Sequence, residues 1–168
     1  MSETFAFLSP DLATPDVAAA EAAWRSPLER ALQHPPAGVV DISLTGKLEV
    51  RGDLDSLAAD GGELVRISPS RGLVLCDFTK TTRLRRKLEE DFLVVDLSAA
   101  YAGLQVRSEM LLRRLTDVDL DDLPAVGSVA HVRTVVLRDA ETFRLFFPQE
   151  YGHYLAEVVV DAAEGLQA

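Results

Sequence analysis

Two closely similar stretches, Val39-Val-Asp-Ile-Ser43 and Val94-Val-Asp-Leu-Ser98, decide how this chain folds. Each leads into a second stretch of strand character, and these second stretches match as Lys47-Leu-Glu-Val-Arg51 and Gly103-Leu-Gln-Val-Arg107 once one inserted residue is allowed in the second copy. A motif that recurs in the same order along a chain indicates repeated structural units. The sequence is therefore predicted to be internally duplicated.

The two predicted halves cover residues near 39–93 and 94–163. Alternating apolar residues and the turn residues between them predict, in each half, two strands, a connection, two more strands and a closing helix. The later strands are expected at Glu63–Ser68, Gly72–Phe78, Ala130–Arg138 and Thr142–Phe147. The closing helices are expected at Thr79–Asp91 and Gln149–Ala163, the latter with an apolar face of Tyr151, Tyr154, Leu155, Val158, Val159 and Ala162.

The connections within the two halves differ. Residues 108–115 are good helix formers with an apolar face, whereas residues 53–62 end in Asp60-Gly61-Gly62 and predict no helix. The expected fold class is therefore α+β, with internally duplicated ββ(α)ββα halves whose antiparallel or mixed sheets are flanked by helices.

Residues 24–168 are expected to form one domain, preceded by an arm over residues 1–23. The arm is rich in Ala, Asp, Pro, Ser and Thr but carries Phe5, Phe7 and Leu8, which suit packing on a neighbouring subunit. A helix is predicted to start at Ser26-Pro27, with serine as its cap and proline in its first turn.

Composition and charge exclude several classes of function. The chain has 48% hydrophobic and 26% charged residues, the balance of a globular domain. Its net charge of −10 repels phosphate backbones, so no nucleic-acid partner is expected. We expect no membrane association and a cytoplasmic location, because neither a signal peptide nor a membrane-length apolar run is visible.

The motifs of common catalytic and cofactor sites are missing from the sequence. The glycines do not follow dinucleotide or phosphate-loop spacing, so no bound flavin or nucleotide is expected in this chain. The histidines, His34, His131 and His153, lie far apart, and the acidic run over residues 116–122 lacks the glycine and glutamate of a calcium loop. Cys76 sits in an apolar run and is expected in the core. We therefore predict no catalytic, cofactor-binding or metal-binding residues.

Two features remain open to a structural or a functional interpretation. Ser43 and Ser98 each follow an aspartate at a strand end, where such residues commonly form turns. Residues 80–87 form an island of positive charge, with Leu84 and Leu88 expected to face inward. This island is either a solvated helix face or a surface that docks on an acidic partner.

From Ser26 onward the chain resembles the gamma subunits of heterotetrameric sarcosine oxidase, which belong to the wider group of folate-binding-fold proteins that includes the aminomethyltransferase of glycine cleavage. The resemblance is carried by the order of short motifs rather than by one diagnostic element. They are Arg25–Leu28, Leu93–Ser98, Leu104–Arg107, Met110–Leu115, Asp119-Leu120, Val126–Ser128, Thr142–Pro148 and Tyr154-Leu155.

The resemblance implies a folate-binding fold like that of the N-terminal part of aminomethyltransferase. It also implies a non-catalytic subunit with no activity alone, in a complex that oxidatively demethylates sarcosine. FAD, FMN, NAD and tetrahydrofolate are then expected in larger, alpha- and beta-type flavoprotein partner subunits. Two departures from the family are a short connection between Arg51 and Ser68 and a strand at 131–136 in place of a glycine-containing hairpin with a catalytic aspartate.

Two alternatives stay open at this point. The chain could be a stand-alone tetrahydrofolate-binding or aminomethyltransferase-like protein, which needs an arginine and an acidic group in a pocket. Arg51 and Arg107 are available for that role, although both are expected at exposed strand ends. It could also be the scaffold subunit of a related oxidase that demethylates a different secondary amine.

Overall fold

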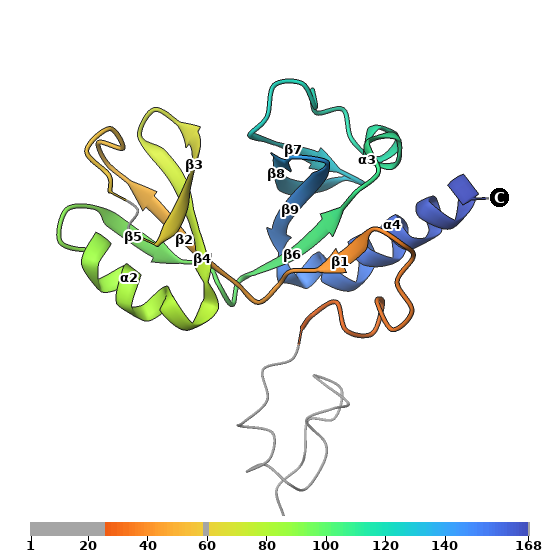
Figure 1. Ribbon diagram of the computed structural model, residues 1–168, viewed down its shortest axis with the longest axis horizontal. Coiled ribbons are helices and arrows are strands. Elements are labelled where there is room, and N and C mark those ends of the chain that lie inside the picture. Colours follow the sequence, from red (N-terminus) through yellow and green to blue (C-terminus); the bar gives the residue numbers. More distant parts are fainter. Residues whose placement is uncertain (1–25, 59–60, 168) are drawn as a thin grey trace, which may run out of the picture.

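The computed structural model describes residues 26–58 and 61–167. These residues form two antiparallel sheets with helices on their outer sides (Figure 1). The predicted arm over residues 1–23, including its three apolar residues, lies outside the described part of the chain. No helix in that part is long and apolar enough to cross a bilayer.

The four-stranded sheet is covered on one face by helix α2 (Thr81–Leu88), which follows a short 3-10 turn, η2 (Phe78–Lys80). Its strands, in spatial order, are β3 (Gly62–Ser68), β4 (Arg71–Asp77), β2 (Thr45–Arg51) and β5 (Leu93–Asp96). Leu84 and Leu88 are buried against the sheet, as predicted from their spacing. The basic side chains of the helix therefore lie on its other faces.

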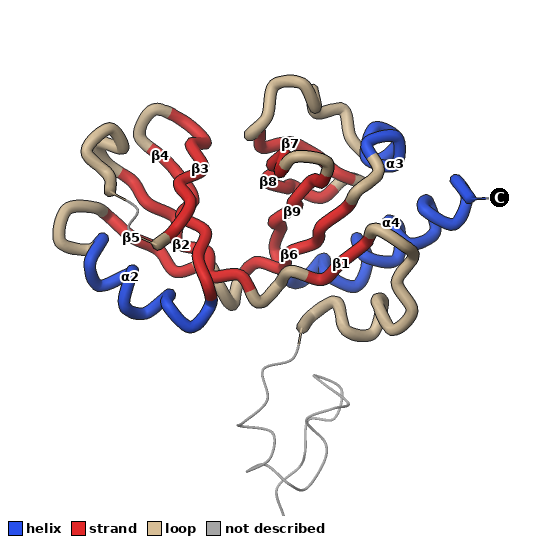
Figure 2. Tube along the Cα trace, viewed as in Figure 1, coloured by secondary structure: helices blue, strands red, loops and turns tan. Residues whose placement is uncertain are grey.

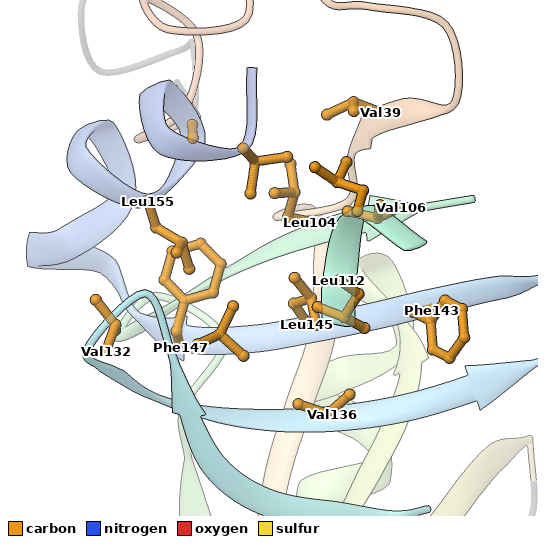
Figure 3. Close-up of a cluster of buried hydrophobic side chains, with 14 of the residues drawn as sticks. Val39, Leu104, Val106, Leu112, Val132, Val136, Phe143, Leu145, Phe147 and Leu155 are labelled. Atoms are coloured by element: carbon orange, nitrogen blue, oxygen red, sulfur yellow. The ribbon is translucent and has the colours of Figure 1, made fainter. Parts of the chain in front are cut away.

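The five-stranded sheet is covered by two helices, α3 (Glu109–Leu115) and α4 (Gly152–Gln167), the latter preceded by the 3-10 turn η3 (Gln149–Tyr151). Its strands, in spatial order, are β1 (Val39–Asp41), β6 (Tyr101–Val106), β9 (Thr142–Pro148), β8 (Val132–Asp139) and β7 (Ala125–Val129). Figure 3 shows the core between this sheet and its helices, where Leu112 and Leu155 pack on Leu145 and its neighbours.

The two sheets do not divide at the boundary between the predicted halves. Strand β1 leaves the first half to pair with β6, and β5 leaves the second half to pair with β2 (Figure 2). All strand pairs in the described part of the chain are antiparallel, so the mixed sheet that was allowed as an alternative does not occur. The segments at 42–44 and 97–100 connect one sheet to the other, and we call this region the joint.

The repeated Asp-x-Ser motif builds the joint with two matching sets of hydrogen bonds. Asp41 and Asp96 each accept the amide of the serine two residues on, both at 2.9 Å. The Ser43 hydroxyl then accepts the Gly103 amide at 3.1 Å, and the Ser98 hydroxyl accepts the Lys47 amide at 2.9 Å. The serines therefore hold backbone in place, while internal duplication as the origin of this correspondence stays a prediction.

A third apolar cluster fills the space between the two sheets. Val65, Leu73 and Leu75 of the four-stranded sheet are buried with Val135, Leu137 and Phe146 of the five-stranded sheet. Both sheets therefore have two covered faces over part of their width, with helices outside and the other sheet inside. On these inner faces, polar side chains of the strands are shielded from water.

Three sequence-based predictions need correction. The strand expected at 130–138 begins at Val132, because Ala130 and His131 form a two-residue hairpin with positive φ angles of 45° and 67° after β7. The helix expected from Ser26 is a short turn, in which the Leu28 amide donates to the Ser26 hydroxyl before the chain reaches Pro35-Pro36. Tyr151 and Tyr154 are exposed, so the buried stripe of α4 is Leu155, Ala156, Val159 and Ala163.

Candidate functional site

The inner face of the four-stranded sheet gathers charged side chains from β2 and β4. Strand alternation sends Leu48 and Val50 of β2 towards α2, so Lys47, Glu49 and Arg51 point to the opposite, inner face. An alternating strand of this kind normally shows its charges to water. Here Lys47 is 0% exposed and Glu49 5% exposed; Lys47 lies beside Phe146 of the second sheet, and Glu49 is bonded to the Arg71 side chain of β4.

Lys47 is fully enclosed at the joint. Its Nζ donates to the backbone carbonyls of Ser43 at 2.8 Å and Thr45 at 2.6 Å, and it lies 5.8 Å from the centre of the Phe146 ring. Burial lowers the pKa of this amine to about 8, although the carboxylates of Asp96 and Asp41 act in the opposite direction. An amine with this pKa is a possible nucleophile or base, but the enclosure gives a substrate no route to it. Lys47 therefore acts as a structural donor.

Glu49 holds two arginines of neighbouring strands. It accepts Arg51 Nε at 2.7 Å and Arg71 Nη2 at 2.5 Å. Burial tends to raise the pKa of Glu49, but the hydrogen bonds from Arg71 and Arg51 outweigh it, and the pKa is lowered. We call these three residues the Glu49 cluster, whose formal charge is +1.

A second charged contact ties the two sheets together. Arg144 of β9 donates Nη1 and Nη2 to the two carboxylate oxygens of Glu63 on β3, at 2.9 and 2.7 Å. Hydrogen bonding to Glu63 raises the pKa of Arg144 above its usual value. This bidentate pair fixes the relative orientation of the two sheets. Arg144 therefore has a structural role and is not free to bind a ligand.

A groove of about 290 Å³ lies between β3 and β8, lined in part by Arg66, Leu123, Pro124, Leu137 and Arg138. Its two cations already have acceptors. Arg66 donates to the Leu54 carbonyl and to Asp55, both at or below 2.8 Å. Arg138 donates to Glu109 and to the Leu120 carbonyl, both at 3.1 Å. An anionic ligand in this groove would have to displace these acceptors.

The histidines and the cysteine do not form a common site in the described part of the chain. His34 and His131 are exposed, and His153 lies 3.2 Å from Glu157 on the same helix. Cys76 is half-buried beside Thr81, and burial raises its pKa, which makes its thiol a poorer nucleophile. Among residues 26–58 and 61–167 no group of three or more histidine, cysteine or acidic side chains is placed to hold a metal ion.

The Glu49 cluster and Lys47 were not found from the sequence. Arg51 was expected at an exposed strand end, and its side chain is indeed half exposed, but its partners Glu49 and Arg71 could not be inferred. The available signal was the alternation Lys47, Glu49, Arg51 on one face of an otherwise apolar strand. Only knowledge that β4 and the second sheet cover that face turns this alternation into a buried cluster.

No protein-family profile and no curated protein matches this sequence. Among solved structures, a chain of heterotetrameric sarcosine oxidase from Corynebacterium sp. U-96, in complex with pyrrole 2-carboxylate, aligns with a TM-score of 0.68 and 18% identity. The alignment covers 86% of this chain and 97% of that one. Aminomethyltransferase T of the glycine cleavage system from Bartonella henselae aligns with a TM-score of 0.57 and 15% identity, over 79% of this chain and 48% of that one.

The chain has the folate-binding, aminomethyltransferase-like fold. It spans about half the length of aminomethyltransferase T but almost the whole of the oxidase chain. A structure of aspartokinase alpha and beta subunits also aligns, with a TM-score of 0.50 and 9% identity over 81% of this chain and 99% of that one. Related architecture is thus used in proteins of different function, and the fold by itself does not fix the activity.

Proposed function

We propose that this protein is the non-catalytic, gamma-type subunit of a heterotetrameric sarcosine (N-methyl amine) oxidase complex. The observation that carries the proposal is the alignment over 97% of a chain from a heterotetrameric sarcosine oxidase, with a TM-score of 0.68. Almost every part of the aligned oxidase chain has a counterpart in this chain. This coverage supports a comparison with that chain as a whole.

The contacts of the polar side chains support a scaffold role. The charged groups at the joint, between the sheets and in the β3–β8 groove all have partners within the chain. A catalytic acid, base or nucleophile has to reach a substrate and hold a matching pKa. Lys47 has a lowered pKa but is fully buried, and Arg144 is mostly buried and paired with Glu63.

In this proposal the chemistry belongs to the partners. The larger, alpha- and beta-type flavoprotein subunits hold FAD, FMN, NAD and tetrahydrofolate, and this chain supplies packing surface in a cytoplasmic complex. The arm over residues 1–23 adds to that surface. Neither nucleic acid nor a membrane takes part.

Co-expression tests the proposal directly. A tagged version of this chain is expressed together with the larger flavoprotein subunits of a sarcosine oxidase from the same source. We expect a stoichiometric complex that carries the visible absorption of flavin and oxidises sarcosine, while the isolated chain is colourless and inactive. Turnover of sarcosine by the isolated chain, or purification of the chain without any flavoprotein, would rule the proposal out.

The folate-binding alternative is supported by the alignment with aminomethyltransferase T and by the pairing of arginine with a carboxylate in the Glu49 cluster. None of Glu49, Arg51 and Arg71 lines the β3–β8 groove. Titration of the isolated chain with tetrahydrofolate by calorimetry separates the two proposals. Tight binding without partner subunits favours the stand-alone protein.

The other alternative concerns the substrate of the complex. A scaffold subunit does not contact the amine, so an oxidase for a different secondary amine would fit the same structure. Assaying the purified complex with a panel of N-methyl amines assigns the substrate.

A further inference from the structure

Strand β5 is an edge strand that shows apolar side chains to solvent. It pairs with β2 on one side, and no strand of the described chain lies on its other side. Val94 is buried towards α2, whereas Leu93 is 62% and Val95 42% exposed. Open edges with exposed apolar residues are normally blocked in monomeric proteins because they pair with other chains. Here the edge carries no proline and no lysine.

The strand register places these apolar residues next to the Glu49 cluster. Leu93 is directly opposite Arg51, which is opposite Arg71 on the next strand. Val95 is directly opposite Glu49. Residues opposite each other in antiparallel strands share a face. Leu93, Val95, Arg51 and Arg71 therefore form one continuous surface, which we call the β5 patch.

The β5 patch has one positive charge in excess. Two guanidinium groups in adjacent strands repel each other, and the single carboxylate of Glu49 serves both. The Nε of Arg71 is buried and has no hydrogen-bond partner among the described residues. A second carboxylate beside Arg51 would balance the excess charge. The chain as a whole has a charge of −10, so this local excess stands out from its surroundings.

We propose that the β5 patch is the docking site for an extended segment of a larger partner subunit. In this arrangement the segment adds as a strand to the free edge of β5, lays apolar side chains on Leu93 and Val95, and places a carboxylate next to Arg51, the arginine nearer to that edge. Strand addition supplies backbone hydrogen bonds, and alternate side chains supply selectivity. The proposal rests on the proposed function, because it assigns the place at which the complex is assembled.

A second copy of this chain is a poorer occupant. Two molecules that each carry a charge of −10 repel each other. The single acidic residue of β5, Asp96, already accepts the Ser98 amide at 2.9 Å. Pairing of β5 with its own copy would thus offer no free carboxylate from that strand to the two arginines.

The test uses the co-expressed complex and a matched pair of variants. The double variant Leu93→Asp and Val95→Asp removes the apolar contact and repels a carboxylate. Its control, Met110→Asp and Tyr151→Asp, changes two apolar residues of similar exposure, 60% and 47%, outside the four-stranded sheet. We expect capture of the flavoprotein subunits to fall at least tenfold for the β5 variant and to stay within twofold for the control.

Hydrogen exchange on the unmodified complex provides a measurement that does not depend on how the variants fold. Amides of residues 93–96 are expected to exchange at least tenfold more slowly in the complex than in the isolated chain. Arg51→Gln, at a half-exposed position, is expected to weaken capture while keeping the melting temperature within a few degrees.

The possible failures are distinguishable. If the unmodified chain captures no flavoprotein subunit, the proposed function is wrong, and the docking site is withdrawn with it. If capture occurs but is equal for the β5 variant and the control, or if residues 93–96 gain no protection, the complex exists and the docking site lies elsewhere.

Discussion

At the scale of single residues, the most unusual feature is an amine buried in the joint between two sheets. A neutral amine has two hydrogens, and Lys47 has two carbonyl partners, those of Ser43 and Thr45. A charged amine would add a third hydrogen on the side of the Phe146 ring. These contacts can stabilise the charged amine, because two hydrogens have carbonyl acceptors and the third faces an aromatic ring, while burial lowers the pKa to about 8.

This predicts a pH dependence of stability. The pKa of Lys47 falls from 10.5 to about 8 on folding, so between these values the unfolded chain binds more protons at this residue than the folded chain. The free energy of unfolding should therefore rise with pH across this window, by on the order of 2 kcal/mol. Urea unfolding of the wild type and of Lys47→Met from pH 7.5 to 10.5 measures it.

The difference between the two curves isolates the lysine. Burial raises the pKa of Cys76, and this has the opposite sign, because the unfolded thiol loses its proton first as the pH rises. That contribution is present in both proteins and largely cancels on subtraction. If the difference in the free energy of unfolding between the wild type and Lys47→Met does not change with pH, the pKa of Lys47 is not lowered.

The serines of the joint give a second prediction at this scale. Ser98→Ala removes the acceptor of the buried Lys47 amide, a bond of 2.9 Å. An unsatisfied buried donor costs about 1–3 kcal/mol, so we expect a loss of that size in the free energy of unfolding. Ser70→Ala, at an exposed turn, is the control and should change it by less than about 0.5 kcal/mol. Equal effects of the two substitutions would contradict the structural role assigned to Ser98.

At the scale of elements, local patterns predicted the regular parts well. The spacing of Leu84 and Leu88 placed α2 on its sheet, and the serine at 108 caps α3 by accepting the Leu111 amide at 3.1 Å. The β7–β8 hairpin was missed because its turn residues, Ala130 and His131, are not those that favour positive φ. The Tyr154 hydroxyl donates a hydrogen bond to the Ala130 carbonyl at 3.2 Å, and this contact helps to hold the turn in its observed conformation.

The hairpin can be improved by restoring the missing turn residues. Ala130→Asn with His131→Gly should relieve the left-handed backbone at φ values of 45° and 67°. We expect a gain of about 1 kcal/mol in the free energy of unfolding, seen as a higher urea midpoint with an unchanged slope. The control is Glu141→Gln on the next hairpin, an exposed residue whose change should be neutral. No gain at the Ala130-His131 turn would mean that packing, not backbone strain, dominates there.

At the scale of the whole molecule, the exchange of β1 and β5 between sheets was beyond sequence reasoning. Repeated motifs show which segments correspond, but they do not show whether a strand pairs within its own half or with the other. The burial of Lys47 and Glu49 follows from this arrangement of sheets. The inner-face residues of the candidate site were therefore missed for the same reason as the topology.

The arm gives a prediction that belongs to the assembly. Removal of residues 1–23 should weaken capture of the flavoprotein subunits more than tenfold while changing the free energy of unfolding of the isolated chain by less than about 1 kcal/mol. Parallel pull-down and urea titration measure the two effects. If capture of the flavoprotein subunits and the free energy of unfolding fell together, the arm would be part of the domain and not of the interface.

The exchange of β1 and β5 has a consequence for the way the molecule comes apart. Neither sheet can be completed from its own half of the chain, because each borrows an outer strand from the other half. Melting of one lobe removes a strand from its neighbour, so both should be lost in a single cooperative step. Two fragments severed near residue 92 should accordingly be unstructured apart and regain order only when mixed.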